Sequence, residues 1–541
     1  MAEEERTIVW RLSDNGMGIL ERVGLAALYM TLRTAEEQSV DLKPLYWRED
    51  DLTADSVTVR WIGKDRSAFE KLFAWAWQIR DGVFYFPGIH RELDQKEFAY
   101  RRVFTHNGVL RTFLQHNRVQ PRAKAKDATT LVEQIEEGKQ IQVRFLAIDP
   151  ERHGIKPIKD LKLLFPDGRF SASPISLSGW VLPGIAPRFA TELAWIGLAS
   201  RAILLMLAPI ACCYQRLAGK GNNWIFVAPD VKNLEEFNNL RPYIFLSPDA
   251  VNVASLGDAG LRFAAAYASR TASREVRASS RVVAMGGVHY YRSQSVRKAV
   301  LDVKPTPSAV NRYQHLIRAF PNNYVSIEVG PSDHSDVEGD GFFSVPSGRG
   351  RIADNLVAGR GWFNDLCIPL QWDFERLERQ RKAAPGASIE RIWFQNLSYQ
   401  RRKLMELIQE TEMWDDDFER RFVEAFWSTL ASLYAQEAKA VERGGSRRFE
   451  ERLDDLNEDI RRSLMRAKTR VLLRGFLAEL FAKSGRQAAV IQNGAGIWNL
   501  MDHPYDWKKA RDLALLALAT YQSKDKRERS TTQNTENGGT L

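Results

Sequence analysis

Cysteine is scarce in this chain. Only 3 of its 541 residues are cysteines: Cys212 and Cys213 are adjacent, and Cys367 is the third. A disulfide framework needs an even set of spaced cysteines, and a zinc site of the usual kind needs closely spaced pairs of ligands. The sequence excludes both arrangements, and we expect a protein of the reducing cytoplasm that holds no metal.

Long hydrophobic runs are also missing. The most apolar segment, AILLMLAPIACCY, extends only from Ala202 to Tyr214 and follows Arg201. A helix that spans a membrane needs about 20 apolar residues, so we expect a buried core helix here and no membrane partner. The first residues, MAEEERTIVWRL, contain neither the basic nor the apolar region of a secretory signal, and we expect no such signal.

Common catalytic signatures are absent from the sequence. It contains no GxxxxGKS/T loop, no complete GxGxxG after a strand, no HExxH and no GxSxG. Its 8 histidines are scattered along the chain. The sequence therefore offers no motif for a cofactor, and we expect none.

One acidic segment, GPSDHSDVEGDG, supports an alternative. Its acidic residues and one histidine can in principle hold a divalent metal ion for phosphodiester hydrolysis, which makes a metal-dependent nuclease the second hypothesis. These residues are Asp333, His334, Asp336, Glu338 and Asp340. A nuclease of this kind needs further ligands on separate helices, and an acidic surface loop explains the same residues.

Charge and length indicate what kind of protein remains. A hydrophobic content of 44% is enough for a folded core, and 541 residues exceed what one core usually serves, so we expect two or more domains. The formal net charge of +9 favours anionic partners.

Periodicity predicts an α+β fold. In residues 1–387, short strand-like runs such as DSVTVRWIG and NWIFVAPDV alternate with helical stretches such as LERVGLAALYMTLRTAEE. Residues 388–522 carry apolar residues at helical spacing with few breakers, which predicts an all-helical C-terminal bundle. Residues 523–541 lack apolar anchors and should be disordered. The expected helices of the bundle are 398–442, 447–484, 486–500 and 507–522.

The segment RRSLMRAKTRVLLR places four arginines four residues apart: Arg462, Arg466, Arg470 and Arg474. On one helix they would form a row with steps of about 6 Å, close to the spacing of phosphates along a nucleic-acid strand. Like charges at this spacing disfavour a helix unless an anion lies against them. Alternatively, Glu458 precedes Arg462 by four residues, and the pattern is that of a self-sufficient surface helix.

A second basic cluster lies in AYASRTASREVRASSRVVAMGGVHYYRSQSVRKAVLDVKP. Guanidinium groups alternate there with hydroxyls, a combination that contacts phosphates, and Tyr290 and Tyr291 are candidates for stacking on bases. The basic candidates are Arg270, Arg274, Arg277, Arg281, Arg292, Arg297 and Lys298. An exposed arginine-rich helix followed by a strand pair is the alternative interpretation.

Two further segments combine basic residues with helix breakers. In QHNRVQPRAKAK, amides can read base edges and the cations can bind phosphates; the candidates are Gln115, Asn117, Gln120, Arg122 and Lys124. In SGRGRIADNLVAGRGW, glycines would let the backbone approach a sugar-phosphate chain beside Arg349, Arg351 and Arg360. A solvated loop and a plain turn are the alternatives.

Four segments in order along the chain carry a family resemblance: RVGLAALYMTLRTAEE, NWIFVAPDVKNLEEFNNLRPYIFLSPDAVNVASLGDAGLRFAAAY, AMGGVHYYRSQSVRKAV and IWNLMDHPYDWKKARDLALLALATYQ. Together they resemble the large subunit of type I CRISPR surveillance complexes, or Cascade. The similarity is closest to the MYXAN branch and its type I-B relatives, some of which serve CRISPR-associated transposons.

The resemblance implies a non-catalytic subunit that recognises the protospacer-adjacent motif in double-stranded DNA. It would promote strand opening and stabilise the R-loop, while guide CRISPR RNA supplies sequence specificity. The implied partners are guide RNA, target DNA, the backbone, handle-binding and small subunits of Cascade, and a recruited helicase-nuclease or transposition proteins. The N-terminal region would meet the motif and the guide, and the helical bundle would line the strand path. A basic adaptor that binds only protein is a third hypothesis.

Overall fold

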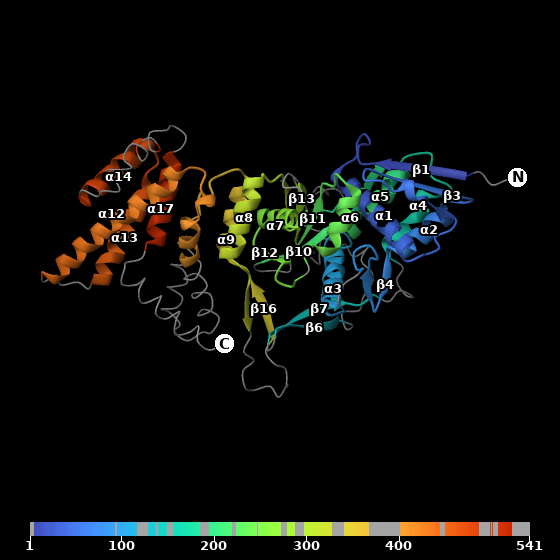
Figure 1. The fold of residues 1–541 in the computed structure, drawn as a ribbon, viewed down its shortest axis with the longest axis horizontal. Coiled ribbons are helices and arrows are strands. Elements are labelled where there is room, and N and C mark those ends of the chain that lie inside the picture. The colour runs from blue at the N-terminus through green and yellow to red at the C-terminus, as the bar shows by residue number, and fades with distance from the viewer. Residues whose placement is uncertain are drawn as a thin grey trace, which may run out of the picture. The chain divides into compact units, whose positions relative to one another are not determined.

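The computed structural model describes residues 5–91, 95–115, 128–136, 139–148, 155–183, 194–218, 223–245, 247–271, 278–286, 297–326, 340–366, 401–443, 449–485, 498, 500 and 507–521. The chain divides into two compact units (Figure 1). The first contains Met1–Val310 and Pro321–Gly350, and the second contains Asn311–Phe320 and Arg351–Leu541. In the described residues, no helix combines the length and apolar character needed to cross a membrane.

Two buried helices, α1 (Ile19–Glu37) and α5 (Ala199–Ala211), pack along each other in the first unit. The apolar segment that begins at Ala202 forms most of α5, so the prediction of a core helix is confirmed. The contact is close because Gly24 has no side chain: a Cβ there would collide with the backbone carbonyl of Leu204.

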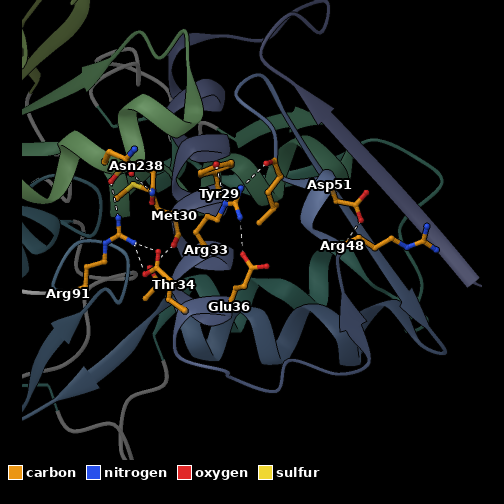
Figure 2. A network of polar contacts seen from close by, with 12 residues as sticks. Tyr29, Met30, Arg33, Thr34, Glu36, Arg48, Asp51, Arg91 and Asn238 are labelled. Carbon is orange, nitrogen blue, oxygen red and sulfur yellow. Dashed lines mark hydrogen bonds and ion pairs between the residues drawn. The ribbon is translucent and has the colours of Figure 1, made fainter. Parts of the chain in front are cut away.

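A network of polar contacts fixes the C-terminal half of α1 (Figure 2). Arg33 donates from Nε to the Tyr29 hydroxyl at 3.2 Å and from Nη2 to the Leu52 carbonyl at 3.1 Å. Arg91 donates to the backbone carbonyl of Asn238, which lies in α6 (Leu234–Leu240), at 3.2 Å. Arg33 and Arg91 therefore stabilise the fold through contacts within the chain.

The largest sheet has five strands in the order β12-β10-β11-β13-β14. All neighbours are antiparallel except β10 and β12. Helix α3 covers the face that carries Tyr214, and α7 covers the face that carries Val303, since a Cβ on Gly108 of α3 or Gly260 of α7 would collide with these side chains. The elements are β10 (Cys213–Leu217), β11 (Asn223–Pro229), β12 (Asn252–Val253), β13 (Ser280–Met285), β14 (Arg297–Val303), α3 (Gln95–Arg111) and α7 (Leu256–Ala268).

A three-stranded antiparallel sheet lies near the N-terminus in the order β1-β3-β2, with α2 packed against it. Aromatic side chains fill the space beside it: the ring of Phe69 lies 5.4 Å from Trp61 and 5.6 Å from Phe165, centroid to centroid. The elements are β1 (Glu5–Arg11), β2 (Leu45–Tyr46), β3 (Ser56–Ile62), α2 (Asp65–Ala76) and α4 (Lys156–Leu164). Two-stranded sheets are β4 (Gln78–Arg80) with β5 (Val83–Tyr85), and β8 (Ile175–Ser178) with β9 (Ala194–Gly197).

A four-stranded sheet has the order β15-β16-β7-β6. Its central pair, β16 and β7, is parallel, and the outer pairs are antiparallel. Tyr324 bridges the sheet, because its hydroxyl donates to the Gln140 carbonyl at 2.8 Å and its ring lies over Gly341. The strands are β6 (Ala128–Glu136), β7 (Lys139–Leu146), β15 (Asn323–Ser326) and β16 (Asp340–Ser344).

The second unit is helical. Residues 401–409 form a helix, and a short 3-10 turn follows at Thr411–Met413. In the described part of this unit, four longer helices make the bundle: α12 (Asp417–Glu442), α13 (Phe449–Arg466), α14 (Arg470–Lys483) and α17 (Trp507–Thr520). Helix α12 packs on α17. Two helices, α8 (Pro307–Ala319) and α9 (Ser347–Val357), contribute residues to both units.

The predicted α+β fold with a helical C-terminal bundle is confirmed, and so is the helix expected at 507–522. The expected helices 398–442 and 447–484 are wrong, because each is interrupted. Most of 486–500, the boundary at residue 388 and the tail 523–541 lie outside the described residues, and these expectations stay predictions.

Candidate nucleic-acid interface

The four arginines of the predicted row lie on two helices. Helix α13 ends at Arg466 and α14 begins at Arg470, with non-helical backbone between them. Thr469 has an extended backbone, and its hydroxyl accepts a hydrogen bond from the Leu472 amide at 3.3 Å. A threonine that caps the next helix competes with continuation of the previous one. The prediction of one straight row is therefore wrong, and the arginines flank a bend.

The first arginine of the set is held by a carboxylate. Arg462 donates to Glu458 at 2.7 Å, and Arg461 grips the same carboxylate with two contacts of 2.8 Å. The hydrogen bond from Arg461 is the main reason that the pKa of Glu458 is lowered. Here the self-sufficient surface helix describes the structure well.

The surface around the start of α14 differs in its charge from the surface around Arg462. Arg466, Lys468, Arg470 and Arg474 are all exposed, and the first turn of α14 contains no acidic residue. Between these cations, Val471 and Leu472 are 73% and 58% exposed. The guanidinium of Arg474 lies over the ring of Trp498 at 5.6 Å. We call Arg466, Lys468, Arg470, Val471, Leu472 and Arg474 the elbow surface. It combines cations with aliphatic side chains that water covers at some cost.

The second basic cluster is only partly described. Arg270 is exposed just beyond the end of α7. Arg281 on β13 makes a two-pronged ion pair with Asp302 on β14, at 2.7 and 3.0 Å, and its hydrogen bond lowers the pKa of Asp302. Arg281 is therefore already neutralised within the sheet. Outside the described residues lie Arg274, Arg277, Tyr290, Tyr291 and Arg292, and for Arg297 and Lys298 only the backbone of β14 is described.

Gln115 does not face solvent. Its side chain is buried, and Nε2 donates to the Gly286 carbonyl at 2.5 Å. The residue ties the segment after α3 to the end of β13, so the prediction that it reads base edges is wrong. Asn117, Gln120, Arg122 and Lys124 lie outside the described residues.

The glycine-rich segment forms a helix, α9, from Ser347 to Val357, and a turn follows it, after which Arg360 is exposed. The Arg349 side chain is fully buried and pairs with buried Asp258 at 2.9 Å, with a second bond from Nε at 3.0 Å. Gly350 permits this depth, because a Cβ there would lie 2.8 Å from the side chain of Ala254. The prediction of a phosphate contact is therefore wrong for Arg349, whereas Arg351 is exposed.

The nuclease alternative concerns the acidic segment that leads into β16. Asp333, His334, Asp336 and Glu338 lie outside the described residues, and Asp340 begins β16. Among the residues that are described, no group of three or more His, Cys, Asp or Glu side chains is placed to hold a metal ion.

Two histidines inside the first unit serve the fold. Burial lowers the pKa of His90 well below its ordinary value and that of His106 to about 4. Neutral His106 accepts a hydrogen bond at Nδ1 from the Phe84 amide at 3.3 Å, so Nε2 carries the proton that it donates to the Leu146 carbonyl at 2.9 Å.

Sequence reasoning missed one cavity, of about 540 Å³, in the first unit. It opens beside the edge strand β1, where Arg6 pairs with Asp65 at 2.5 Å, and exposed Arg169 lies on its rim. Its other lining residues include Trp61, Phe170 and Ser200. These segments are far apart in sequence, and no local pattern links them.

Comparisons with known proteins give the family. Residues 9–206 match the family described as DevT N-terminal domain, and residues 409–540 match the DevT C-terminal domain. Over 538 residues the chain is 24% identical to "CRISPR-associated protein Cas8a1/Csx13" of Myxococcus xanthus (strain DK1622), across 95% of this chain and 88% of that relative. The predicted resemblance to large subunits of type I CRISPR complexes is confirmed, and the chain belongs to this CRISPR-associated family.

Proposed function

We propose that the chain is a non-catalytic large subunit of an RNA-guided Cascade. In this role it recognises the protospacer-adjacent motif in double-stranded DNA, promotes strand opening and holds the separated strands. Guide RNA delivers the sequence specificity, as in other RNA-guided systems, and the protein supplies motif recognition and backbone contacts. Other Cascade subunits and a recruited helicase-nuclease or set of transposition proteins complete the list of partners.

The observation that carries this proposal is the elbow surface. Arg466, Lys468 and Arg470 present positive charge to solvent at a bend, and Val471 and Leu472 stand between them. Cations neutralise phosphates, and aliphatic side chains can enter between unstacked bases. A surface that carries both is suited to a DNA strand whose bases have been exposed.

We assign recognition of the motif and contacts with the guide RNA to the first unit. Asn117, Gln120, Arg122 and Lys124 remain candidates for reading the motif, and Tyr290 and Tyr291 remain candidates for base stacking. The exposed side chains of Arg270 in the first unit and Arg351 in the second unit remain candidates for backbone contacts. Because Gln115 and Arg349 are buried, they drop out of the set.

The experiment is an R-loop assay on the complex reconstituted with guide RNA and all subunits. Arg466→Ala with Arg470→Ala should shorten R-loop lifetime on the order of 10-fold, since each change removes a charge-assisted contact to a phosphate. The accepted motifs should not change. Arg462→Ala is the matched control, because Arg462 belongs to the same set of four arginines but is paired with Glu458.

The outcomes separate the three hypotheses. A change in motif preference with the double variant would overturn the assignment of the elbow surface. Cleavage of DNA by the purified chain with manganese would favour the nuclease centred on Asp333–Asp340. Failure of the complete complex to bind either duplex or single-stranded DNA would favour the protein-binding adaptor.

A further inference from the structure

The four-stranded sheet of the first unit has one covered face and one open face. On the covered face, Ile141 is buried, and Phe145 lies against His106 of α3 with ring centroids 6.2 Å apart. Side chains alternate between the two faces of a strand. Gln142 and Arg144 therefore point away from α3, and both are exposed.

An exposed aromatic side chain occupies the middle of the open face. Gly341 pairs with Ile141, so Phe342 on the central strand β16 points to the same side as Gln142. Phe342 is 48% exposed. Val132 on β6, the cross-strand partner of Gln142, is 50% exposed. Phe343 belongs to the covered face, where its ring centroid lies 6.0 Å from that of Tyr324. Phe342 has no place on that face, because it points to the open side.

Positive charge lies at one end of this face. Arg144 is exposed and makes no ion pair in the described part of the chain, and its cross-strand neighbour is Thr130.

Asp340, the first residue of β16, lies at the opposite end of the strands, because it pairs with Gln140 near the start of β7. A polyanion is attracted toward Arg144, and Phe342 lies between these two ends.

From this placement we infer that the open face of the sheet binds single-stranded RNA. One base stacks on Phe342, a neighbouring phosphate pairs with Arg144, and the polar side chains of Gln142 and Thr130 meet the ribose. Four-stranded sheets with exposed aromatic side chains bind single-stranded RNA in this manner in an unrelated class of proteins. The inference rests on the proposed function, in which guide RNA is a partner.

RNA is the ligand that the side chains around Phe342 suit best. An amide and a hydroxyl both donate and accept hydrogen bonds, as the 2′-hydroxyl of ribose does, whereas deoxyribose offers no such group. An apolar protein partner would gain little from the charge of Arg144.

The test measures binding of the purified full-length chain to an unstructured, fluorescently labelled RNA oligonucleotide and to DNA of the same sequence. Phe342→Ala should weaken RNA binding about 5- to 150-fold, the range measured when a stacking aromatic is removed. Phe342→Tyr, which keeps the ring, should restore most of the affinity. Phe418→Ala is the matched control, because Phe418 is an exposed phenylalanine of the second unit with 50% exposure.

A second variant tests the phosphate contact. Arg144→Ala should lower the slope of log affinity against log salt by about 0.7, the value for one phosphate of a single strand. Arg11→Ala on β1, an exposed arginine without an ion pair among the described residues, should leave the slope unchanged. A thermal melt of each variant separates loss of binding from loss of folding.

Three results would overturn the inference: no binding of single-stranded RNA, equal loss with Phe342→Ala and Phe418→Ala, or DNA bound as tightly as RNA and with the same sensitivity to Phe342. None of these bears on the elbow surface. R-loop formation by the complex with the Arg466→Ala and Arg470→Ala chain checks the proposed function separately, so either idea can fail alone.

Discussion

Two arginine-containing segments look alike in sequence and lie in opposite environments in the structure. In α9, Arg349 is fully buried against Asp258, and it helps to hold the first unit together. In the elbow surface, Arg466 and Arg470 are exposed and precede or follow a helix break. The difference teaches that arginines in similar sequence contexts can be buried against an internal carboxylate, as Arg349 is, or exposed beside a helix break, as Arg466 and Arg470 are.

The largest effect on stability is expected for the buried member of this comparison, Arg349. Arg349→Ala leaves the Asp258 carboxylate buried without its cation, and the free energy of unfolding should fall by about 3–5 kcal/mol. Chemical denaturation of the full chain measures it. Arg351→Ala is the control, since its exposed side chain should change stability by less than about 0.5 kcal/mol. Equal effects of the two changes would contradict the assignment of Arg349 to the core.

A smaller effect is expected at the bend itself. Thr469→Ala removes the cap of α14 and should cost about 1 kcal/mol of local stability, because the Leu472 amide loses its partner. Hydrogen exchange of the first amides of α14 measures the change, and Thr469→Ser should preserve their protection. If Thr469→Ala leaves exchange unchanged, the cap does not create the bend.

The smallest effect concerns Glu458, whose carboxylate pairs with Arg462. This ion pair is the reason that Arg462 is not part of the elbow surface. The folded pKa of Glu458 is lowered, so its ion pairs stabilise the fold above the ordinary carboxyl pKa, and this contribution is lost as the pH falls through the folded pKa. Exposed pairs of this kind contribute less than about 1 kcal/mol. Arg461→Ala should raise the pKa of Glu458 toward its ordinary value, as an NMR titration of the side chain would detect. An unchanged pKa would mean that Arg461 does not hold the carboxylate in solution.

Regular, strongly periodic segments could be predicted from the sequence. Helices α1, α5 and α17 follow directly from their apolar spacing, β3 and β7 follow from their alternation, and β11 follows from its short apolar run. The break between α13 and α14 could not be predicted in the same way, because the apolar stripe continues through it from Leu464 to Leu473. Only the capping threonine signals the break.

The site was harder to predict than the fold. The exposure of Arg466 and Arg470 follows from the helical stripe, but the burial of Arg349 and Gln115 depends on Asp258 and Gly286, which are remote in sequence. The open face with Phe342 needs the pairing of β16 with β7, a parallel contact between distant strands. Local patterns carry no information about such pairings.

The most direct test of the central claim is the salt dependence of target binding by the complete guide-loaded complex. Each phosphate contact in duplex DNA contributes about 0.9 to the slope of log affinity against log salt, and each contact to a single strand contributes about 0.7. With Arg466→Ala and Arg470→Ala combined, the slope should therefore fall by roughly 1.4 to 1.8, whereas Arg462→Ala should leave it nearly unchanged. A slope that is the same in all three complexes would show that the elbow surface does not contact DNA.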